Sequence, residues 1–405
     1  MRTLLLLWII LLLTGLPQSG SAQDLAVIAE KLYTMSPAGV LTDGVVLIEN
    51  GKIRAVGNAS DLRIPSGIPV LRTAVATPGF VDAHASVGLS GAYNVTADQD
   101  IDENTEPNTA ELRAIDGYLP TEMLVRYLLE QGVTTVHVGP GYLNPIAGQS
   151  AIFKTTGNTV QDALVQFPAA MMLNLGEAPK FPDKAPTTRM ATAMIIRKAL
   201  QEAIGYAQKQ NSAAEDEKPP VDLRQAALAQ VTDGTIPAVI TCHRSDDIMT
   251  ALRLAKEFNL RLIIDGGTDA FLLRDEIKAA GVPVLVAPTM QRPGNMENLN
   301  GTFESAAFLW KAGIPIAIQS GFESYVPKTR IISFEAGVAM ANRLPEIEAL
   351  RAITISPAKI LGISNRVGSL ETGKDADIVL LDGAPLEYLT HVEAVIVEGK
   401  TVYER

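Results

Sequence analysis

The sequence contains almost no cysteine, no low-complexity tract and no apolar run long enough to cross a membrane, and each shortage narrows the class of protein. Cys242 is the single cysteine among 405 residues, so we expect neither an internal disulfide nor a lipid-anchoring cysteine after the N-terminal region. The apolar residues 4–13 fall well short of the ~20 that span a bilayer. With 47% hydrophobic and 20% charged residues, the composition excludes a disordered or fibrous protein. The chain is therefore expected to bury a generous core.

The N-terminus predicts a targeting segment that does not belong to the fold. Arg2, the apolar residues 4–13 and the small residues Gly20, Ser21 and Ala22 form the pattern of a cleavable signal peptide over residues 1–22. We therefore expect a periplasmic or secreted protein with no membrane span after cleavage; an uncleaved anchor is the alternative. The formal net charge of -11 makes nucleic acid and anionic membrane surfaces poor partners.

Strand-like segments at both chain ends flank a middle in which short apolar runs alternate with helical periodicity. Residues 45–57 predict two strands around Asn50-Gly51, the commonest hairpin dipeptide, and residues 376–403 predict further strands. Because either set alone would leave exposed edges, we expect both ends to meet in one small β-sandwich domain, residues 23–76 plus 364–405. Residues 77–363 predict about eight strand–helix units, which favours an α/β fold of the (β/α)8 TIM-barrel type.

The most informative stretch is PGFVDAHAS, residues 78–86, which follows an apolar, strand-compatible run. Side chains two apart on a strand share a face, so Asp82, His84 and Ser86 are expected to point the same way into the barrel. The stretch resembles the first barrel strand of the amidohydrolase superfamily, where a second histidine stands in the place of Ser86. Residues 139–154 resemble the imidazolonepropionase-like branch, and GSLETGKDADIV, residues 368–379, adds a signature that extends the resemblance over essentially the whole mature chain.

The resemblance implies a metal-dependent hydrolase acting on carbon–nitrogen bonds other than peptide bonds, such as a cyclic amide. By family position His84 and His243 match ligands of two different metals. Gly266 stands where the family has another histidine, and Gly321 stands where it has the aspartate that ligates metal and takes the proton from water. With Ser86, three expected ligands are missing, so we expect the standard binuclear site to be incomplete and the protein to be impaired or non-catalytic.

Three alternatives stay open on the sequence. A single zinc or similar divalent metal fits if His84 and His243 join one carboxylate from Asp82, Glu177 or Asp265, since two histidines and a carboxylate form a known ligand set; otherwise no cofactor is expected. The same side chains fit metal-free acid–base chemistry by an imidazole that an aspartate orients. A third possibility is a protein that binds a small molecule in the barrel mouth, as a homo-oligomer or as the partner subunit of an intact homologue.

The candidate site residues divide into two groups. Asp82, His84 and His243 are the candidate catalytic residues, and the two histidines are the metal ligands if a rebuilt site exists. The expected pocket residues are Ser86, Lys154, Glu177, Asp265, Gly266 and Gly321. Two further residues are expected to be structural: His137 lies between valines, and Cys242 should face away from His243 because adjacent strand residues point to opposite faces.

Overall fold

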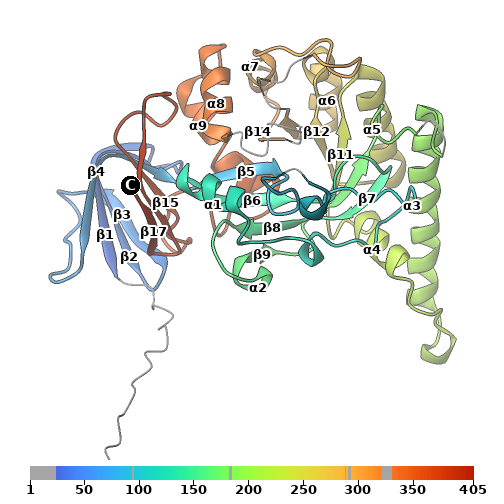
Figure 1. Ribbon diagram of the computed structural model, residues 1–405, viewed down its shortest axis with the longest axis horizontal. Helices are drawn as coiled ribbons and strands as arrows, with labels where there is room; N and C mark the ends of the chain where they lie inside the picture. The colour runs from blue at the N-terminus through green and yellow to red at the C-terminus, as the bar shows by residue number, and fades with distance from the viewer. Residues whose placement is uncertain (1–23, 94, 182–184, 288, 291–292, 322–330) are drawn as a thin grey trace, which may run out of the picture.

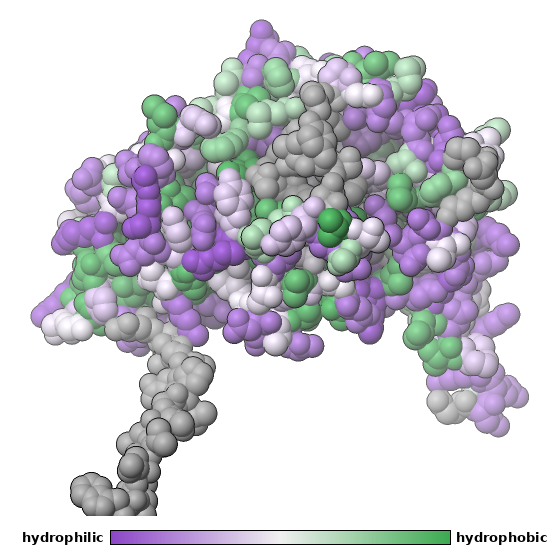
Figure 2. Space-filling view, in the orientation of Figure 1, coloured by the Kyte–Doolittle hydropathy of each residue, from purple (hydrophilic) through white to green (hydrophobic). Residues whose placement is uncertain are grey.

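The computed structural model describes residues 24–93, 95–181, 185–287, 289–290, 293–321 and 331–405. The expected signal peptide, residues 1–22, lies outside these ranges. Among the helices within them, none combines the length and the apolar character that crossing a bilayer requires. Figure 2 shows polar residues over most of one face of the molecule, with apolar residues scattered among them.

Both chain ends contribute strands to one seven-stranded sheet, in the order β17-β16-β15-β4-β1-β2-β3 (Figure 1). Asn50 and Gly51 form the turn between β2 and β3, with φ of 52° and 79°, the positive values that a tight hairpin turn needs. The two chain ends meet where β15 pairs antiparallel with β4. The strands are β1 (Leu25–Tyr33), β2 (Val40–Glu49), β3 (Lys52–Asn58), β4 (Val70–Pro78), β15 (Ile378–Leu381), β16 (Val392–Val397) and β17 (Lys400–Glu404).

The middle of the chain forms a six-stranded sheet, β14-β13-β12-β11-β10-β7, and a four-stranded sheet, β5-β6-β8-β9. Neighbours from β10 to β14 are parallel, as are β5 and β6, and a parallel bridge between Ala85 and Gly321 links β5 to the end of β14. The carboxyl ends of these strands therefore gather at one mouth, as in TIM-barrel-type folds. The strands are β5 (Phe80–Ala85), β6 (Val133–Val138), β9 (Leu164–Gln166), β10 (Met171–Asn174), β11 (Ala238–Cys242), β12 (Leu262–Gly266), β13 (Val284–Val286) and β14 (Ile316–Ile318).

The expected series of eight parallel units is interrupted at the third position. Here β7 (Ile146–Gln149) runs antiparallel to β10, and β8 (Ala151–Lys154) runs antiparallel to β6. Ser150 lies between β7 and β8 and exchanges backbone hydrogen bonds with Ala169 and Ala170. Because β8 runs in the opposite direction, its last residue lies at the amino ends of the parallel strands, away from the mouth.

Helices follow most of the parallel strands and surround the two middle sheets (Figure 1). The 24-residue α3 lies along the outer side of this layer, and α5 starts directly after His243 and Arg244. The helices are α1 (Met123–Glu130), α2 (Val160–Ala163), α3 (Arg189–Ser212), α4 (Leu223–Thr232), α5 (Ser245–Phe258), α6 (Arg274–Ala280), α7 (Ser305–Lys311), α8 (Ile332–Ala341), α9 (Glu346–Arg351) and α10 (Ile355–Ile360).

A buried apolar layer inside the strands forms the floor of the mouth. Its members come from successive strands and include Met172, Val239, Ile263, Leu285 and Ala317. Two residues further along β11 and β12 are Thr241 and Asp265. The two-residue period of a strand therefore places these polar side chains on the same inner face, directly above the apolar floor.

Candidate functional site

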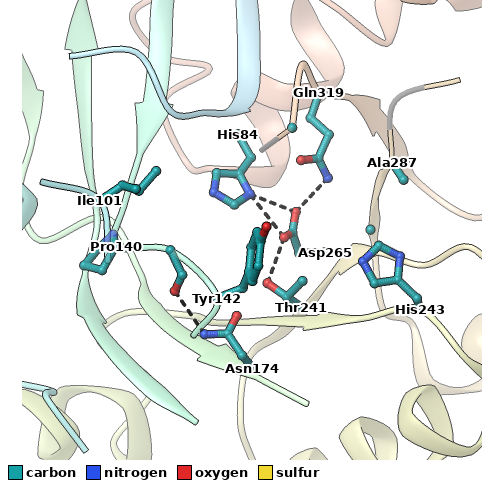
Figure 3. Close-up of a pocket in the computed structure, with 13 residues that line it drawn as sticks. His84, Ile101, Pro140, Tyr142, Asn174, Thr241, His243, Asp265, Ala287 and Gln319 are labelled. Atoms are coloured by element: carbon teal, nitrogen blue, oxygen red, sulfur yellow. Dashed lines mark hydrogen bonds and ion pairs between the residues drawn. The ribbon is translucent and has the colours of Figure 1, made fainter. Parts of the chain in front are cut away.

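A small polar pocket lies at the carboxyl ends of the parallel strands (Figure 3). Its cavity volume is about 60 Å³. The lining comes from most of the strands around the mouth and from residues on the connecting loops. The lining residues are His84, Ile101, Pro140, Gly141, Tyr142, Asn174, Thr241, His243, Asp265, Gly266, Ala287, Gln319 and Gly321.

The centre of the pocket is a buried pair formed by His84 on β5 and Asp265 on β12. The Nδ1 atom of His84 lies 3.2 Å from Oδ1 and 3.1 Å from Oδ2 of Asp265, so Nδ1–H donates to the carboxylate. Thr241 Oγ1 also donates to Oδ2 at 2.9 Å, and Gln319 Nε2 donates to Oδ1 at 2.7 Å. Both carboxylate oxygens are therefore already occupied by protein donors.

The pair also sets the protonation of its two members. Burial opposes a charge on His84, but the charge and the hydrogen bonds of Asp265 hold the histidine pKa above its usual value. Burial opposes ionisation of Asp265 in the same way, and His84, Thr241 and Gln319 nevertheless hold the pKa of the carboxyl below its usual range. Asp265 is therefore ionised at neutral pH, and its charge favours the Nδ1–H tautomer of His84.

The second ring nitrogen of His84 faces away from Asp265. Figure 3 shows it directed toward the side of the pocket that Ile101 and Pro140 line. No hydrogen bond joins His84 Nε2 to a side chain or backbone group in the described ranges, and His84 keeps 6% of its surface exposed. His84 thus presents a free nitrogen to the cavity while Asp265 fixes the orientation of its ring.

Asp82 and Ser86, which were expected to point into the barrel beside His84, are not among the residues that line this pocket. The pairing of β5 with β6 shifts register between Asp82 and Ala85, and this irregularity breaks the two-residue alternation. Asp82 is fully buried, and its Oδ1 accepts from the backbone N–H of His84 at 3.2 Å and of Ser320 at 3.1 Å. Burial raises the pKa of Asp82 to about 6. Its geometry is that of a carboxyl group that ties β5 to the end of β14.

The Ser86 hydroxyl is buried and has no hydrogen-bond partner in the described part of the chain. A buried hydroxyl without a partner costs free energy, because it loses its hydrogen bonds to water. We therefore expect Ser86→Ala to leave the free energy of unfolding unchanged or to raise it by up to about 1 kcal/mol. Chemical denaturation measures this difference; a loss of more than about 1 kcal/mol would show that the hydroxyl is bonded in solution.

His243 follows β11 and lines the same pocket, close to Gly266. The Thr268 hydroxyl donates to Asn298 Oδ1 at 3.3 Å, so it accepts from His243 Nδ1–H at 2.9 Å, and Nε2 of His243 is left unprotonated. Burial lowers the pKa of His243 and so favours this neutral form. A side chain at Gly266 would meet the imidazole, since a Cβ placed there lies 2.6 Å from His243 Cε1. The ring fills the space that a residue larger than glycine would need.

His137 and Cys242 take structural positions. His137 Nδ1 lies 2.8 Å from the Ala83 carbonyl oxygen and Nε2 lies 2.7 Å from Ser150 Oγ, so both ring nitrogens are engaged. Burial lowers the pKa of His137 to about 4, and the ring is neutral. Cys242 is fully buried among apolar side chains, and burial raises the pKa of its thiol well above the ordinary value. Neither residue lines the pocket.

Glu177 lies in a second, larger cavity of about 560 Å³ next to the first. It bonds Lys180 at 3.2 Å and Arg189 at 3.1 Å. The lining residues are Tyr142, Leu175, Glu177, Ala178, Thr241, His243, Asn295, Met296, Glu297 and Asn298. We call this the outer cavity and the 60 Å³ pocket the inner chamber.

Lys154 lies outside both cavities, which corrects its assignment as a pocket residue. It is 2% exposed, and its ammonium group bonds Asp375 at 3.0 Å and Asp377. The antiparallel direction of β8 is the physical reason, because it brings the end of this strand to the seven-stranded sheet. Of the other expected pocket residues, Asp265, Gly266 and Gly321 line the inner chamber.

The inner chamber also contains neutral polar residues that the sequence did not point to. Gln319 and Thr241 hold Asp265, while Asn174 and Tyr142 line the wall. Each of Thr241, Asn174 and Gln319 lies at or just after the end of a short apolar strand run. A position at the end of a strand is the one feature of the sequence that could have marked these three residues as site residues. Their neutral side chains gave no reason to select them ahead of charged residues.

The donor geometry in the described ranges does not form a metal centre. No group of three or more His, Cys, Asp or Glu side chains in these ranges is arranged to hold a metal ion. His84 Nδ1 and both Asp265 oxygens are used in bonds to protein groups, and His243 Nδ1 is used by Thr268. The arrangement instead places one oriented imidazole beside a small water-sized chamber.

Comparison with known proteins places the chain in a family. A model of the amidohydrolase family matches residues 244–402. The crystal structure of an amidohydrolase from Thermotoga maritima is 32% identical, covers 94% of this chain and 100% of its own, and superposes with a TM-score of 0.89. An imidazolonepropionase from Streptococcus gordonii is 23% identical over 87% of each chain. Amidohydrolase tasK from Hapsidospora irregularis is 26% identical over 85% of this chain, which spans only 38% of that longer protein. The expected resemblance is thus confirmed: this protein belongs to the amidohydrolase superfamily, and its likeness to an imidazolonepropionase agrees with the expected branch.

Proposed function

We propose that this protein binds a small molecule at the mouth of its barrel and does not carry out the two-metal hydrolysis typical of its superfamily. The observation that supports this most directly is the His84–Asp265 pair. His84 Nδ1 donates to Asp265, whose oxygens also accept from Thr241 and Gln319. A histidine and a carboxylate that are bonded to each other and to protein donors offer few lone pairs to an ion.

A divalent metal such as zinc is typical of amidohydrolases, and the residues of this chain do not fit one. Catalytic zinc takes about three protein ligands and one open position. His84 and His243 would be two, and the third position is empty in the described ranges because Gly266 and Gly321 carry no side chain. Asp82, the remaining nearby carboxylate, is bonded to the backbone of β5 and of Ser320. A metal is therefore not part of the proposed chemistry.

The proposal extends to the export of the protein, the closure of its barrel, the class of its ligand and its assembly. We infer an exported, periplasmic or secreted protein, on the N-terminal pattern of residues 1–22. We infer a closed (β/α)8-like barrel with a composite β-sandwich, supported by the bridge between Ala85 and Gly321 and by the shared seven-stranded sheet. The ligand class is a molecule with a carbon–nitrogen bond other than a peptide bond, by relation to amidohydrolases. Assembly with an intact homologue remains part of the proposal.

The metal content of the protein tests the proposal. The mature protein is purified without chelator and without a histidine tag, and its zinc, iron and manganese are measured by elemental mass spectrometry. We expect far less than one equivalent of any of these metals. A His84→Ala/His243→Ala double variant is the control: near-stoichiometric metal in the parent protein that disappears in the double variant would overturn the proposal and establish a rebuilt metal site.

A further inference from the structure

The two cavities at the barrel mouth differ greatly in size and share one wall. The inner chamber has a volume of about 60 Å³ and the outer cavity about 560 Å³. Tyr142, Thr241 and His243 line both. A polar cavity of this size is large enough to hold water. The outer cavity lies within the 300–1,000 Å³ that is usual for small-molecule sites.

The inner chamber contains one nitrogen that is placed to act on such a water. His84 Nε2 is free of protein hydrogen bonds in the described ranges, while Nδ1–H is held by Asp265 at 3.1 Å. In this tautomer Nε2 carries a lone pair, and the adjacent carboxylate stabilises the imidazolium that forms when Nε2 takes up a proton. Thr241 and Gln319 fix Asp265 in turn, so the orientation of the ring is set by three residues.

The described charges around the outer cavity are more acidic than basic. Arg189 is the common partner of Glu177, Asp247 and Glu297, and Lys180 adds a second bond to Glu177. Among the residues that the structure describes here, three carboxylates against two cations leave one net negative charge, and none of the described lining residues is a lysine or an arginine. An uncharged or cationic molecule is therefore favoured over an anionic one.

We propose that the inner chamber holds the attacking water of a metal-independent hydrolysis, with His84 as its general base, and that the outer cavity binds the uncharged or cationic substrate. This inference rests on the proposed function, from which it takes the carbon–nitrogen bond as the target. Asp265 is a positioning residue in this scheme. Tyr142, Thr241 and His243 line both cavities and form the boundary between them.

The proton and electron balance needs no further reagent. The water oxygen forms a bond to the carbonyl carbon while one of its protons moves to His84 Nε2. The carbon–nitrogen bond then breaks, its electron pair stays on the leaving nitrogen, and the proton moves from Nε2 to that nitrogen. The products are a carboxylic acid and an amine, and His84 returns to its neutral form.

The test uses three amides that release 4-nitroaniline: neutral 4-nitroacetanilide, cationic glycine 4-nitroanilide and anionic succinic acid mono-4-nitroanilide. Hydrolysis is measured in excess EDTA. We expect the full-length protein to hydrolyse the neutral and cationic amides faster than the anionic one. His84→Gln should lower these rates by about 100-fold, the lower end of what general-base catalysis contributes. His391→Gln is the matched control, since His391 lies in the seven-stranded sheet domain and bonds Asp382 there, and its rates should equal those of the parent.

The pH dependence of the hydrolysis rate of Asp265→Asn shows whether Asp265 positions His84 or only supports the fold. The titratable groups that face His84 are Asp265 on β12, Asp82 on the same strand and His137 on β6. The rate should rise with pH as His84 loses its proton. Since Asp265 holds the His84 pKa up, the asparagine variant should show the rise at lower pH, as well as a lower maximal rate. A variant that merely unfolds a fraction of the protein would scale the rate without moving the midpoint.

The possible outcomes separate this inference from the proposed function. A metal-free protein whose rates in EDTA are the same for the parent and His84→Gln overturns the inference and leaves the proposed function standing. Rates that depend on His84 but favour the anionic amide overturn the substrate class. Activity that disappears in EDTA and returns with zinc overturns both the inference and the proposed function.

Discussion

Replacing Lys154 with methionine is expected to lower the free energy of unfolding by about 3–5 kcal/mol, the usual effect of removing one partner from a buried ion pair. The Lys154 side chain is 3% exposed, and those of Asp375 and Asp377 are 1% and 4% exposed. Burial alone would lower the pKa of Lys154, but the two aspartates hold it above the ordinary value, so the ammonium group is charged. Methionine keeps the length of the side chain and leaves the two carboxylates facing each other without their shared cation.

Lys52→Met is the matched control, because Lys52 bonds the same carboxylate from the surface. Its side chain is 51% exposed, and Asp375 would keep Lys154 and Arg366 as partners. We expect a loss well under 1 kcal/mol for this variant. Urea denaturation of both variants measures the difference. Equal losses would mean that burial of the Lys154 cluster contributes nothing, contrary to our expectation.

The same cluster gives the protein a predicted sensitivity to acid. Burial opposes ionisation of Asp375, but Lys154, Lys52 and Arg366 hold its pKa below the ordinary value. A carboxyl whose pKa is lower in the folded state contributes stability above its unfolded pKa of about 4 and loses that contribution as pH falls through the folded value. The stability difference between the parent and Lys154→Met should therefore narrow below about pH 4.

Gly266→Ala is expected to destabilise the protein by about 2–4 kcal/mol, which combines a strained backbone with overpacking. Gly266 has a φ of +84°, a conformation that side-chain-bearing residues rarely adopt. An added Cβ would lie 2.6 Å from His243 Cε1 and 3.0 Å from its Nε2. His243 cannot move away freely, because Thr268 holds its Nδ1 at 2.9 Å.

Gly281→Ala separates the two costs. Gly281 has a φ of +67°, and an added Cβ would have nothing within 4 Å. This control should lose only the backbone part, about 1–2 kcal/mol. The difference between the two variants in thermal or urea denaturation measures the clash with the imidazole. If both lose the same amount, His243 does not occupy the space beside Gly266 in solution.

The surroundings of Gly266 also determine whether a metal ligand could be restored at this position. The superfamily has a histidine at this position. In this protein the positive φ of Gly266 and the adjacent His243 ring exclude a histidine side chain there. A single Gly266→His substitution should therefore destabilise the protein without creating a metal site. The structure around Gly266, above all the position of the His243 ring, therefore leaves no room for the histidine ligand that the family has there.

The sequence by itself determined the family, the order of elements and several positions in the mouth. The PGFVDAHAS run and the C-terminal signature led to the superfamily, which the comparisons confirm. The Asn50-Gly51 turn was predictable because only a few dipeptides accept two positive φ angles in succession. His84, Asp265 and Gly266 were expected at the mouth because strand ends in a barrel of this type converge there.

Only the tertiary structure decided which of these side chains meet. A register shift in β5 leaves Asp82 outside the inner chamber that His84 lines, and the reversed direction of β8 carries Lys154 to the opposite end of the strands. Asp265 bonds His84 although the two residues are 181 positions apart in the chain. Local sequence patterns fix which face of a regular strand a residue takes. Strand direction, bulges and long-range partners depend on how the whole sheet pairs, and no local pattern encodes that.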